Sequence, residues 1–141
     1  MVQRVTTLAL ALLSALLISG CDTKIYTQFC TAEALEIPCL RIDSTQDDVN
    51  TLLHPLFEDM NISSSCMFVL KGIHYEVKAC SNPVAHSVGA DFDGYVRVEV
   101  FHEGACYYRA QQDFKSAPWQ QKMRELVQRL QTDLQLHKTT Y

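Results

Sequence analysis

The sequence predicts an α+β domain: an antiparallel sheet of about four strands, with an N-terminal helix and a long C-terminal amphipathic helix packed on it. Two observations indicate this class. Residues 49–57 and 119–134 repeat apolar side chains at helical spacing. Residues 66–78 and 95–110 each hold two strand-like runs around a short turn, as in β-hairpins. The chain has no internal repeat or low-complexity tract.

Residues 21–40 show no regular spacing of apolar residues. We therefore expect residues 21–40 to be a tether that ends in a disulfide-stapled turn, because Cys30 and Cys39 lie close together in the sequence. Residues 35–42 are a candidate strand, and Pro38 restricts such a strand to a sheet edge because it lacks a backbone donor. Residues 41–141 are expected to form a single domain.

A first helix is predicted to begin after Ser44 and Thr45, since each hydroxyl residue stands three positions before an aspartate, as helix caps do. Its apolar face follows at helical spacing: Val49, Leu52, Leu53, Leu56 and Phe57. Pro55 removes a backbone donor within this face, which predicts either a kink near His54 or two short helical pieces.

Two hairpins are predicted next. In residues 66–78 an apolar run meets an alternating run at Lys71-Gly72, which we interpret as a two-residue turn. Residues 95–110 alternate on both sides of His102-Glu103-Gly104. Between the hairpins, residues 81–94 are rich in turn formers and predict an exposed loop that could carry a local function.

The C-terminal helix has the clearest pattern. Ser116 is its cap candidate and Pro118 fits its first turn. Its apolar stripe is formed by Trp119, Met123, Leu126, Val127, Leu130 and Leu134. We expect this stripe to pack on the sheet.

The first twenty residues have the organisation of a secretory signal. Arg4 is followed by an apolar run over residues 8–18 and by the small residues Ser19 and Gly20. This run is too short to cross a hydrocarbon core of about 30 Å as a helix with a rise of about 1.5 Å per residue. Its removal from the 141-residue chain leaves residues 21–141, the size of one domain.

The segment Ile18-Ser19-Gly20-Cys21 resembles the lipobox of bacterial lipoproteins. The resemblance implies cleavage before Cys21 and a lipid on its thiol, with acyl chains such as palmitate holding the domain to a membrane. Asp22 resembles the retention signal of enteric lipoproteins, which favours the inner over the outer membrane of the cell envelope, with the domain facing the periplasm. The alternative is an ordinary signal peptide, after which Cys21 would join a disulfide.

With Cys21 lipidated, five cysteines remain in an oxidising compartment: Cys30, Cys39, Cys66, Cys80 and Cys106. We expect two disulfide bonds and one free thiol. Five cysteines can form two disulfides in 15 different ways, and the sequence alone does not choose among them. Two hypotheses follow from the sequence. Cys66 and Cys106 could pair across the predicted hairpins, and Cys30 and Cys39 could pair because they are close in the chain.

Charge and motifs exclude several function classes. The formal net charge is −4, without a basic stretch, so nucleic acid is not expected as a partner. No nucleophile motif is present, and we expect neither an enzyme nor a cofactor. Asp91-Phe92-Asp93-Gly94 is better explained as a turn than as the start of a calcium loop.

The remaining sequence features leave two function hypotheses. The first is a non-enzymatic, membrane-anchored binding or accessory protein that contacts another envelope protein through its sheet face or the 81–94 loop. The second is a periplasmic metal or small-ligand sensor or carrier, whose ligands would come from Met67, His74, Cys80, His86, His102 and Cys106. Four aromatic residues are candidate contact anchors, although core packing is the favoured interpretation: Tyr75, Tyr107, Tyr108 and Trp119.

Overall fold

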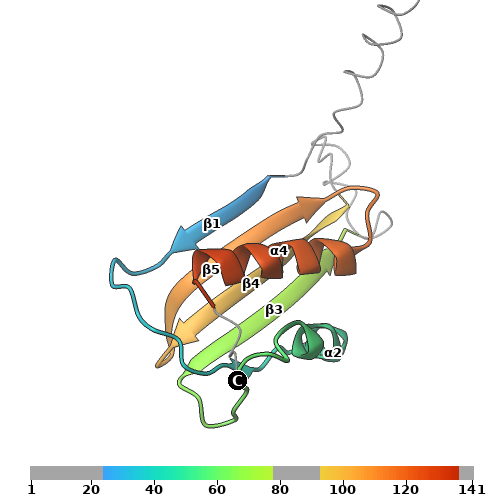
Figure 1. Ribbon diagram of the computed structural model, residues 1–141. Coiled ribbons are helices and arrows are strands. Elements are labelled where there is room, and N and C mark those ends of the chain that lie inside the picture. Colours follow the sequence, from blue (N-terminus) through green and yellow to red (C-terminus); the bar gives the residue numbers. More distant parts are fainter. Residues whose placement is uncertain (1–23, 78–92, 137–141) are drawn as a thin grey trace, which may run out of the picture.

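The computed structural model describes residues 24–77 and 93–136, which form a five-stranded sheet and two helices (Figure 1). The strands are β1 (Ile25–Phe29), β2 (Arg41–Ile42), β3 (Phe68–Glu76), β4 (Gly94–His102) and β5 (Ala105–Phe114). Their order across the sheet is β1-β5-β4-β3-β2. The expected α+β class is confirmed. The signal segment, Cys21, Asp22, Cys80, His86 and residues 81–92 lie outside the described residues.

The second predicted hairpin is confirmed. β4 and β5 pair antiparallel from Gly94 opposite Phe114 to His102 opposite Ala105, with a bulge after Val100. The turn between them holds Glu103 at φ 50° and Gly104 at φ 83°. Positive φ at both central residues is typical of the tight turn that matches the twist of a hairpin, and glycine adopts it without strain.

The first predicted hairpin is wrong. Residues 68–76 form the single straight strand β3, which is antiparallel to β4, and Lys71 and Gly72 lie in its middle. A glycine is needed at position 72 because a helix packs closely against β3 at this point. A Cβ at this position would lie 2.8 Å from Cγ1 of Val49 and 3.0 Å from Cδ1 of Leu53. The missing side chain lets a helix approach the sheet closely, which is another use of glycine in a strand.

Both sheet edges lie in the N-terminal part of the described chain. β1 is antiparallel to β5, although residues 21–40 were expected to be a tether. Its sequence does not alternate between apolar and polar residues because the strand is largely exposed on both faces. β2 is the edge strand expected in residues 35–42, shortened to two residues and parallel to β3. Pro38 lies outside it.

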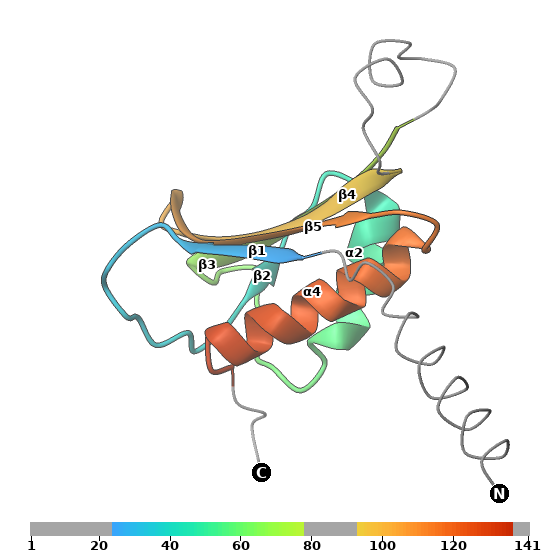
Figure 2. The ribbon, with the colours of Figure 1, turned by 90° about the horizontal axis from the view of Figure 1, so that it is seen from above.

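The helices α2 (Asp47–Leu56) and α4 (Trp119–Asp133) cover the same face of the sheet (Figure 2). The predicted caps are wrong, because Gln46 and Pro118 are the N-cap residues and neither side chain caps the helix. Ser44 is instead buried, and its Oγ accepts a hydrogen bond of 2.7 Å from the backbone N–H of Gly72. Pro55 lies in the last turn of α2, so the helix is not divided into two pieces.

The core lies between the helices and the sheet. It contains the predicted stripe of α4 from Trp119 to Leu130, the alternating valines of β4 and the apolar face of α2. Tyr108 is fully buried in it, and its hydroxyl donates a hydrogen bond of 2.7 Å to Oδ2 of Asp133. Burial, together with this hydrogen bond to a carboxylate, raises the pKa of Tyr108 well above its usual value.

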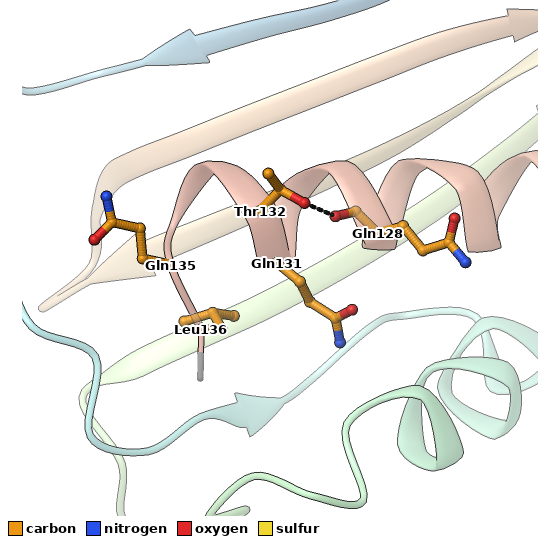
Figure 3. Close-up of a pocket in the computed structure, with 5 residues that line it drawn as sticks. All are labelled: Gln128, Gln131, Thr132, Gln135 and Leu136. Atoms are coloured by element: carbon orange, nitrogen blue, oxygen red, sulfur yellow. Dashed lines mark hydrogen bonds between the residues drawn. The ribbon is translucent and has the colours of Figure 1, made fainter. Parts of the chain in front are cut away.

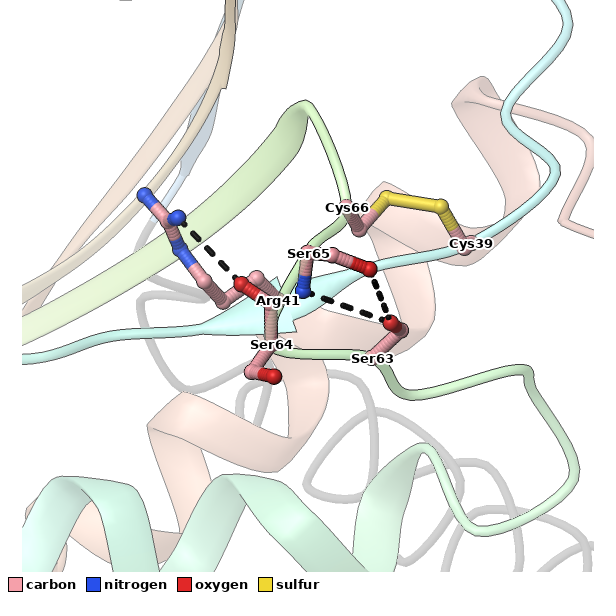
Figure 4. The surroundings of a disulfide bond; sticks show 6 residues. All are labelled: Cys39, Arg41, Ser63, Ser64, Ser65 and Cys66. Carbon is pink, nitrogen blue, oxygen red and sulfur yellow. Dashed lines mark hydrogen bonds between the residues drawn. A yellow bond between two sulfur atoms is a disulfide. The ribbon is translucent and has the colours of Figure 1, made fainter.

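Two disulfides connect the N-terminal segment to the sheet, so the predicted disulfide bonds are confirmed but both hypothesised pairings are wrong. Cys30 is bonded to Cys106, and Cys39 is bonded to Cys66 (Figure 4). The hypotheses failed because they assumed a turn at Lys71-Gly72 and a loose tether.

Within the described residues, no helix is long and apolar enough to cross a membrane.

Candidate binding face of the sheet

Among the described residues, one face of the sheet carries both helices and the opposite face carries none (Figure 2). We call this second face the open face. Side chains alternate between the two faces along each strand. In β4 the even-numbered residues from Gly94 to Val100 are buried under the helices, and Tyr95, Arg97 and Glu99 between them are only partly buried. The register of the neighbouring strands then assigns their residues to one face or the other.

Aromatic rings are spread over the open face. Tyr26 on β1 and Tyr75 on β3 are two of the exposed large hydrophobic residues among the described residues, at 56% and 49%. Tyr75 stacks on its cross-strand neighbour Tyr95, with ring centroids 5.6 Å apart. Phe101 lies on the same face near the other end of β4. Exposed tyrosines of this kind are frequent anchors of protein contacts.

Three of these rings are contacted by a cation. Lys24 Nζ lies 5.4 Å from the ring centroid of Tyr26. Lys71 Nζ lies 5.5 Å from the ring of Phe101, and the guanidinium of Arg97 lies 5.3 Å from that of Tyr95. These contacts hold each cation beside an aromatic ring of the open face.

Polar contacts hold the centre of the open face in place. Nε and Nη2 of Arg97 both donate to Oε1 of Gln111, at 2.9 and 2.7 Å. Gln111 Nε2 in turn donates to Oδ1 of Asp113 at 3.3 Å. Arg109 pairs with Glu99 across the strands at 2.6 Å. These contacts orient the cations, and an ordered cation loses less entropy when it binds a carboxylate.

The charge on the open face is opposite in sign to that of the chain. Within the strands, four basic residues lie on it: Arg41, Lys71, Arg97 and Arg109. Its strands supply two carboxylates, Glu99 and Asp113. The whole chain has 12 basic and 16 acidic residues. The open face is thus a positively charged surface on an acidic protein, which favours contact with an acidic partner.

The aromatic residues singled out in the sequence separate into two groups. Tyr107, Tyr108 and Trp119 are buried in the core, as packing predicts, and Tyr75 is on the open face. The aromatic rings and cations that accompany Tyr75 on the open face were not predicted from the sequence. Alternation in residues 95–101 already placed Tyr95, Arg97 and Glu99 on one side of a strand, but the register with β3 and β5 was needed to find their neighbours.

The structure does not gather the predicted metal ligands among the described residues. Cys106 is in a disulfide, and its sulfur is therefore not a thiolate ligand. His102 stacks on Phe68 at the start of β3, whereas His74, near the other end of β3, stacks on Trp119. Within residues 24–77 and 93–136, no group of three or more histidine, cysteine, aspartate or glutamate residues is arranged to hold a metal ion.

Two acidic residues near the sheet have structural partners. Nε2 of His74 lies 2.9 Å from Oδ2 of Asp48 in the first turn of α2. This hydrogen bond lowers the pKa of Asp48 below its usual value. Oδ2 of Asp93, from the candidate calcium segment, accepts a hydrogen bond of 2.7 Å from the backbone N–H of Ser116. This contact joins the residue before β4 to the segment after β5, and it is not the local turn contact that the sequence predicts for residues 91–94.

The surface hollows offer less chemistry than the open face. One lies beside the last turns of α4 and is lined by amides, a hydroxyl and Leu136 (Figure 3). Its Thr132 donates to the backbone carbonyl of Gln128, and Gln131 donates to that of Leu56. None of its lining side chains titrates near neutral pH. A second hollow lies beside β2, where Arg41 and His54 face Ser63 and Ser64.

Comparison of the chain with protein-family models, with curated proteins and with solved structures finds no significant match.

Proposed function

We propose that this protein is a non-enzymatic bacterial lipoprotein, anchored to the membrane through Cys21, whose open face binds an acidic segment of another envelope protein. The observation that carries the proposal is the open face itself, where cations and exposed aromatic rings are held in fixed positions on an otherwise acidic domain. The lipobox resemblance supports the anchor, and Asp22 favours the inner membrane, with the domain facing the periplasm.

Charge supports an acidic partner. Arg4 is the only charged residue in residues 1–20, so cleavage before Cys21 would leave 11 basic and 16 acidic side chains. The strands of the open face contribute four of the basic residues and two carboxylates. A partner carboxylate is attracted to this face and repelled by the rest of the domain, and this difference orients the approach.

The short distance between the anchor and the sheet limits where the partner lies. Three residues separate Cys21 from Ile25, the first residue of β1. An extended chain spans at most about 3.6 Å per residue, so a lipidated Cys21 would hold β1 within roughly 15 Å of the bilayer surface. The partner segment is then a membrane-proximal part of another envelope protein.

The first experiment measures binding of the full-length protein in detergent to a glutamate-rich peptide, with a lysine-rich peptide of equal length as the charge control. We expect NMR shifts of open-face residues such as Tyr75 and Arg97 with the acidic peptide. Salt should weaken this binding because the cations are exposed. Shifts that are confined to α2 or α4, or that are equal for both peptides, would contradict the proposal.

The second experiment tests the contact in the cell envelope. A photo-reactive residue in place of Ile73 on the open face should yield a protein adduct, and one in place of the exposed Gln120 on α4 should not. The double variant Lys71→Glu/Arg97→Glu should lower the adduct yield by about tenfold, or about 1.4 kcal/mol. Arg124→Glu on α4 is the matched control and should leave the yield unchanged.

A further inference from the structure

The outer edge of β1 has free backbone groups. The N–H of Cys30 donates to the carbonyl of Tyr107, and in an antiparallel pair this fixes which residues face β5. Tyr26 and Gln28 face β5, so the N–H and C=O groups of Ile25, Thr27 and Phe29 point away from the sheet. Within residues 24–77 and 93–136, no backbone hydrogen bond is formed to them on that side.

The two edges of the sheet differ in how they are protected. At the other edge, β2 is only two residues long, and Leu40 just before it exchanges hydrogen bonds of 2.9 Å with Asn61 and Ser63. β1 has five residues, Ile-Tyr-Thr-Gln-Phe, without a charge, a proline or a bulge. Natural sheets use charges, prolines, bulges and short edge strands to prevent pairing with another strand. An edge that lacks these features is suited to such pairing.

The edge of β1 is also accessible and held in place. α4 packs on β4 and β5, and β1 lies beyond it at the side of the sheet (Figure 1). The disulfide between Cys30 and Cys106 ties the end of β1 to the start of β5. A strand fixed in this way loses little further entropy when a partner strand binds.

We propose that β1 pairs with β1 of a second copy of this chain, antiparallel and about a two-fold axis at Thr27. This register places Thr27 opposite Thr27 of the second copy and Ile25 opposite Phe29. All three are residues whose backbone groups point outward, so the register forms about six hydrogen bonds. The two sheets then join into one continuous sheet, with both pairs of helices on the same side.

The side chains of β1 fit this pairing. Phe29 is 50% exposed and would cover Ile25 of the second copy on the helix-covered face. Tyr26 would lie opposite Gln28 on the open face. No charged residue meets a like charge within the five-residue strand. The proposal does not depend on the acidic partner, because the dimer uses the edge of the sheet and leaves the open face uncovered.

A cysteine substitution tests the register in the full-length protein, in its membrane. Opposite residues in a hydrogen-bonded pair have Cα atoms about 5.5 Å apart, within the range of disulfides. Thr27→Cys should therefore convert most of the protein to a disulfide-linked dimer under mild oxidation. Thr51→Cys, at an exposed threonine on α2, is the matched control and should stay monomeric. Equal yields for both variants, or an adduct of Thr27→Cys with another protein, would overturn the proposal.

A proline substitution tests the same edge without a new thiol. The N–H of Thr27 points outward, so Thr27→Pro removes a donor that β5 does not use. Sedimentation of the full-length protein in detergent should give a protein mass of two chains for the unmodified protein and of one chain for Thr27→Pro. Circular dichroism of the variant verifies its fold. A single-chain mass for the unmodified protein at all concentrations, or an unchanged dimer in a folded Thr27→Pro variant, would refute the pairing.

Discussion

The imidazole of His74 lies flat on the indole of Trp119, with ring centroids 4.0 Å apart and planes 5° from parallel. His74 comes from β3, and Trp119 is the first residue of α4. The stack therefore joins the beginning of the C-terminal helix to the sheet. Nε2 of the same histidine contacts Asp48 on α2, so one side chain of β3 touches both helices.

Loss of the Trp119 side chain should destabilise the fold strongly. Trp119 is 8% exposed and packs in the core, and truncation of a buried tryptophan to alanine costs about 3–5 kcal/mol. Urea unfolding followed by circular dichroism measures the change for Trp119→Ala. The exposed neighbour Gln120→Ala is the control and should change the free energy of unfolding by less than about 0.5 kcal/mol. A loss below about 1 kcal/mol for Trp119→Ala would contradict the packing described.

The contact between Asp48 and His74 predicts a pH dependence. The hydrogen bond from His74 lowers the pKa of Asp48 below its usual 3.8, so Asp48 releases its proton more readily in the folded state. Its contribution to stability is therefore present above about pH 4 and is lost as pH falls through the folded-state pKa. Asp48→Asn should reduce the loss of stability on acidification, measured as the thermal midpoint between pH 6 and pH 2.5.

The control for that experiment is Asp47→Asn. Asp47 lies in the same first turn of α2, so its replacement removes an equal charge from the helix N-terminus. The hydrogen bond to His74 is left intact. Identical pH profiles for the Asp47→Asn and Asp48→Asn variants would assign the effect to the helix dipole instead of to His74.

A side chain at Gly72 should be poorly tolerated. Its Cβ would meet side-chain atoms of Val49 and Leu53 of α2 at 2.8 and 3.0 Å, so these side chains or the helix itself must shift. Overpacking of this kind costs about 1–3 kcal/mol. Urea unfolding of Gly72→Ala measures the loss, with Lys71→Ala as the control because Lys71 is exposed on the opposite face. A more stable Gly72→Ala variant would show that the gap between α2 and β3 is wider than described.

The two disulfides should differ in their contribution to stability. Cys30–Cys106 closes 76 residues and Cys39–Cys66 closes 27. The chain-entropy model gives about 4.5 kcal/mol for the longer loop and about 3.5 kcal/mol for the shorter. The paired alanine variants should therefore unfold in the order Cys30/Cys106 before Cys39/Cys66 as urea increases. Peptide mapping without reduction verifies the pairing, and a Cys30–Cys39 peptide would contradict it.

Elements with a complete local pattern were predictable from the sequence. The stripe of α4 is periodic over four turns, and the β4–β5 hairpin has both alternation and a glycine turn. β1 was not predictable because it is exposed on both faces, and such a strand has no period. Gly72 was misread because a glycine that makes room for a helix looks, in sequence, like a glycine that makes a turn.

The candidate site was predictable only in outline. The sequence indicates a sheet face as one of two contact surfaces, but the cations on it come from separate strands. Lys71, Arg97 and Arg109 become neighbours only through the pairing of β3, β4 and β5. The disulfides depend on the same information, since Cys30 reaches Cys106 only when β1 is placed beside β5.

The pairing of β1 with β5 also determines how the domain responds to mechanical load. A pull on the chain at Lys24 acts along β1, perpendicular to its hydrogen bonds with β5, and loads these bonds together in shear. At the far end of β1, the disulfide from Cys30 carries the remaining force directly to Cys106. Tension that enters at the N-terminal end of the sheet therefore loads the β1–β5 hydrogen bonds first, and the disulfide limits how far β1 can be pulled from β5.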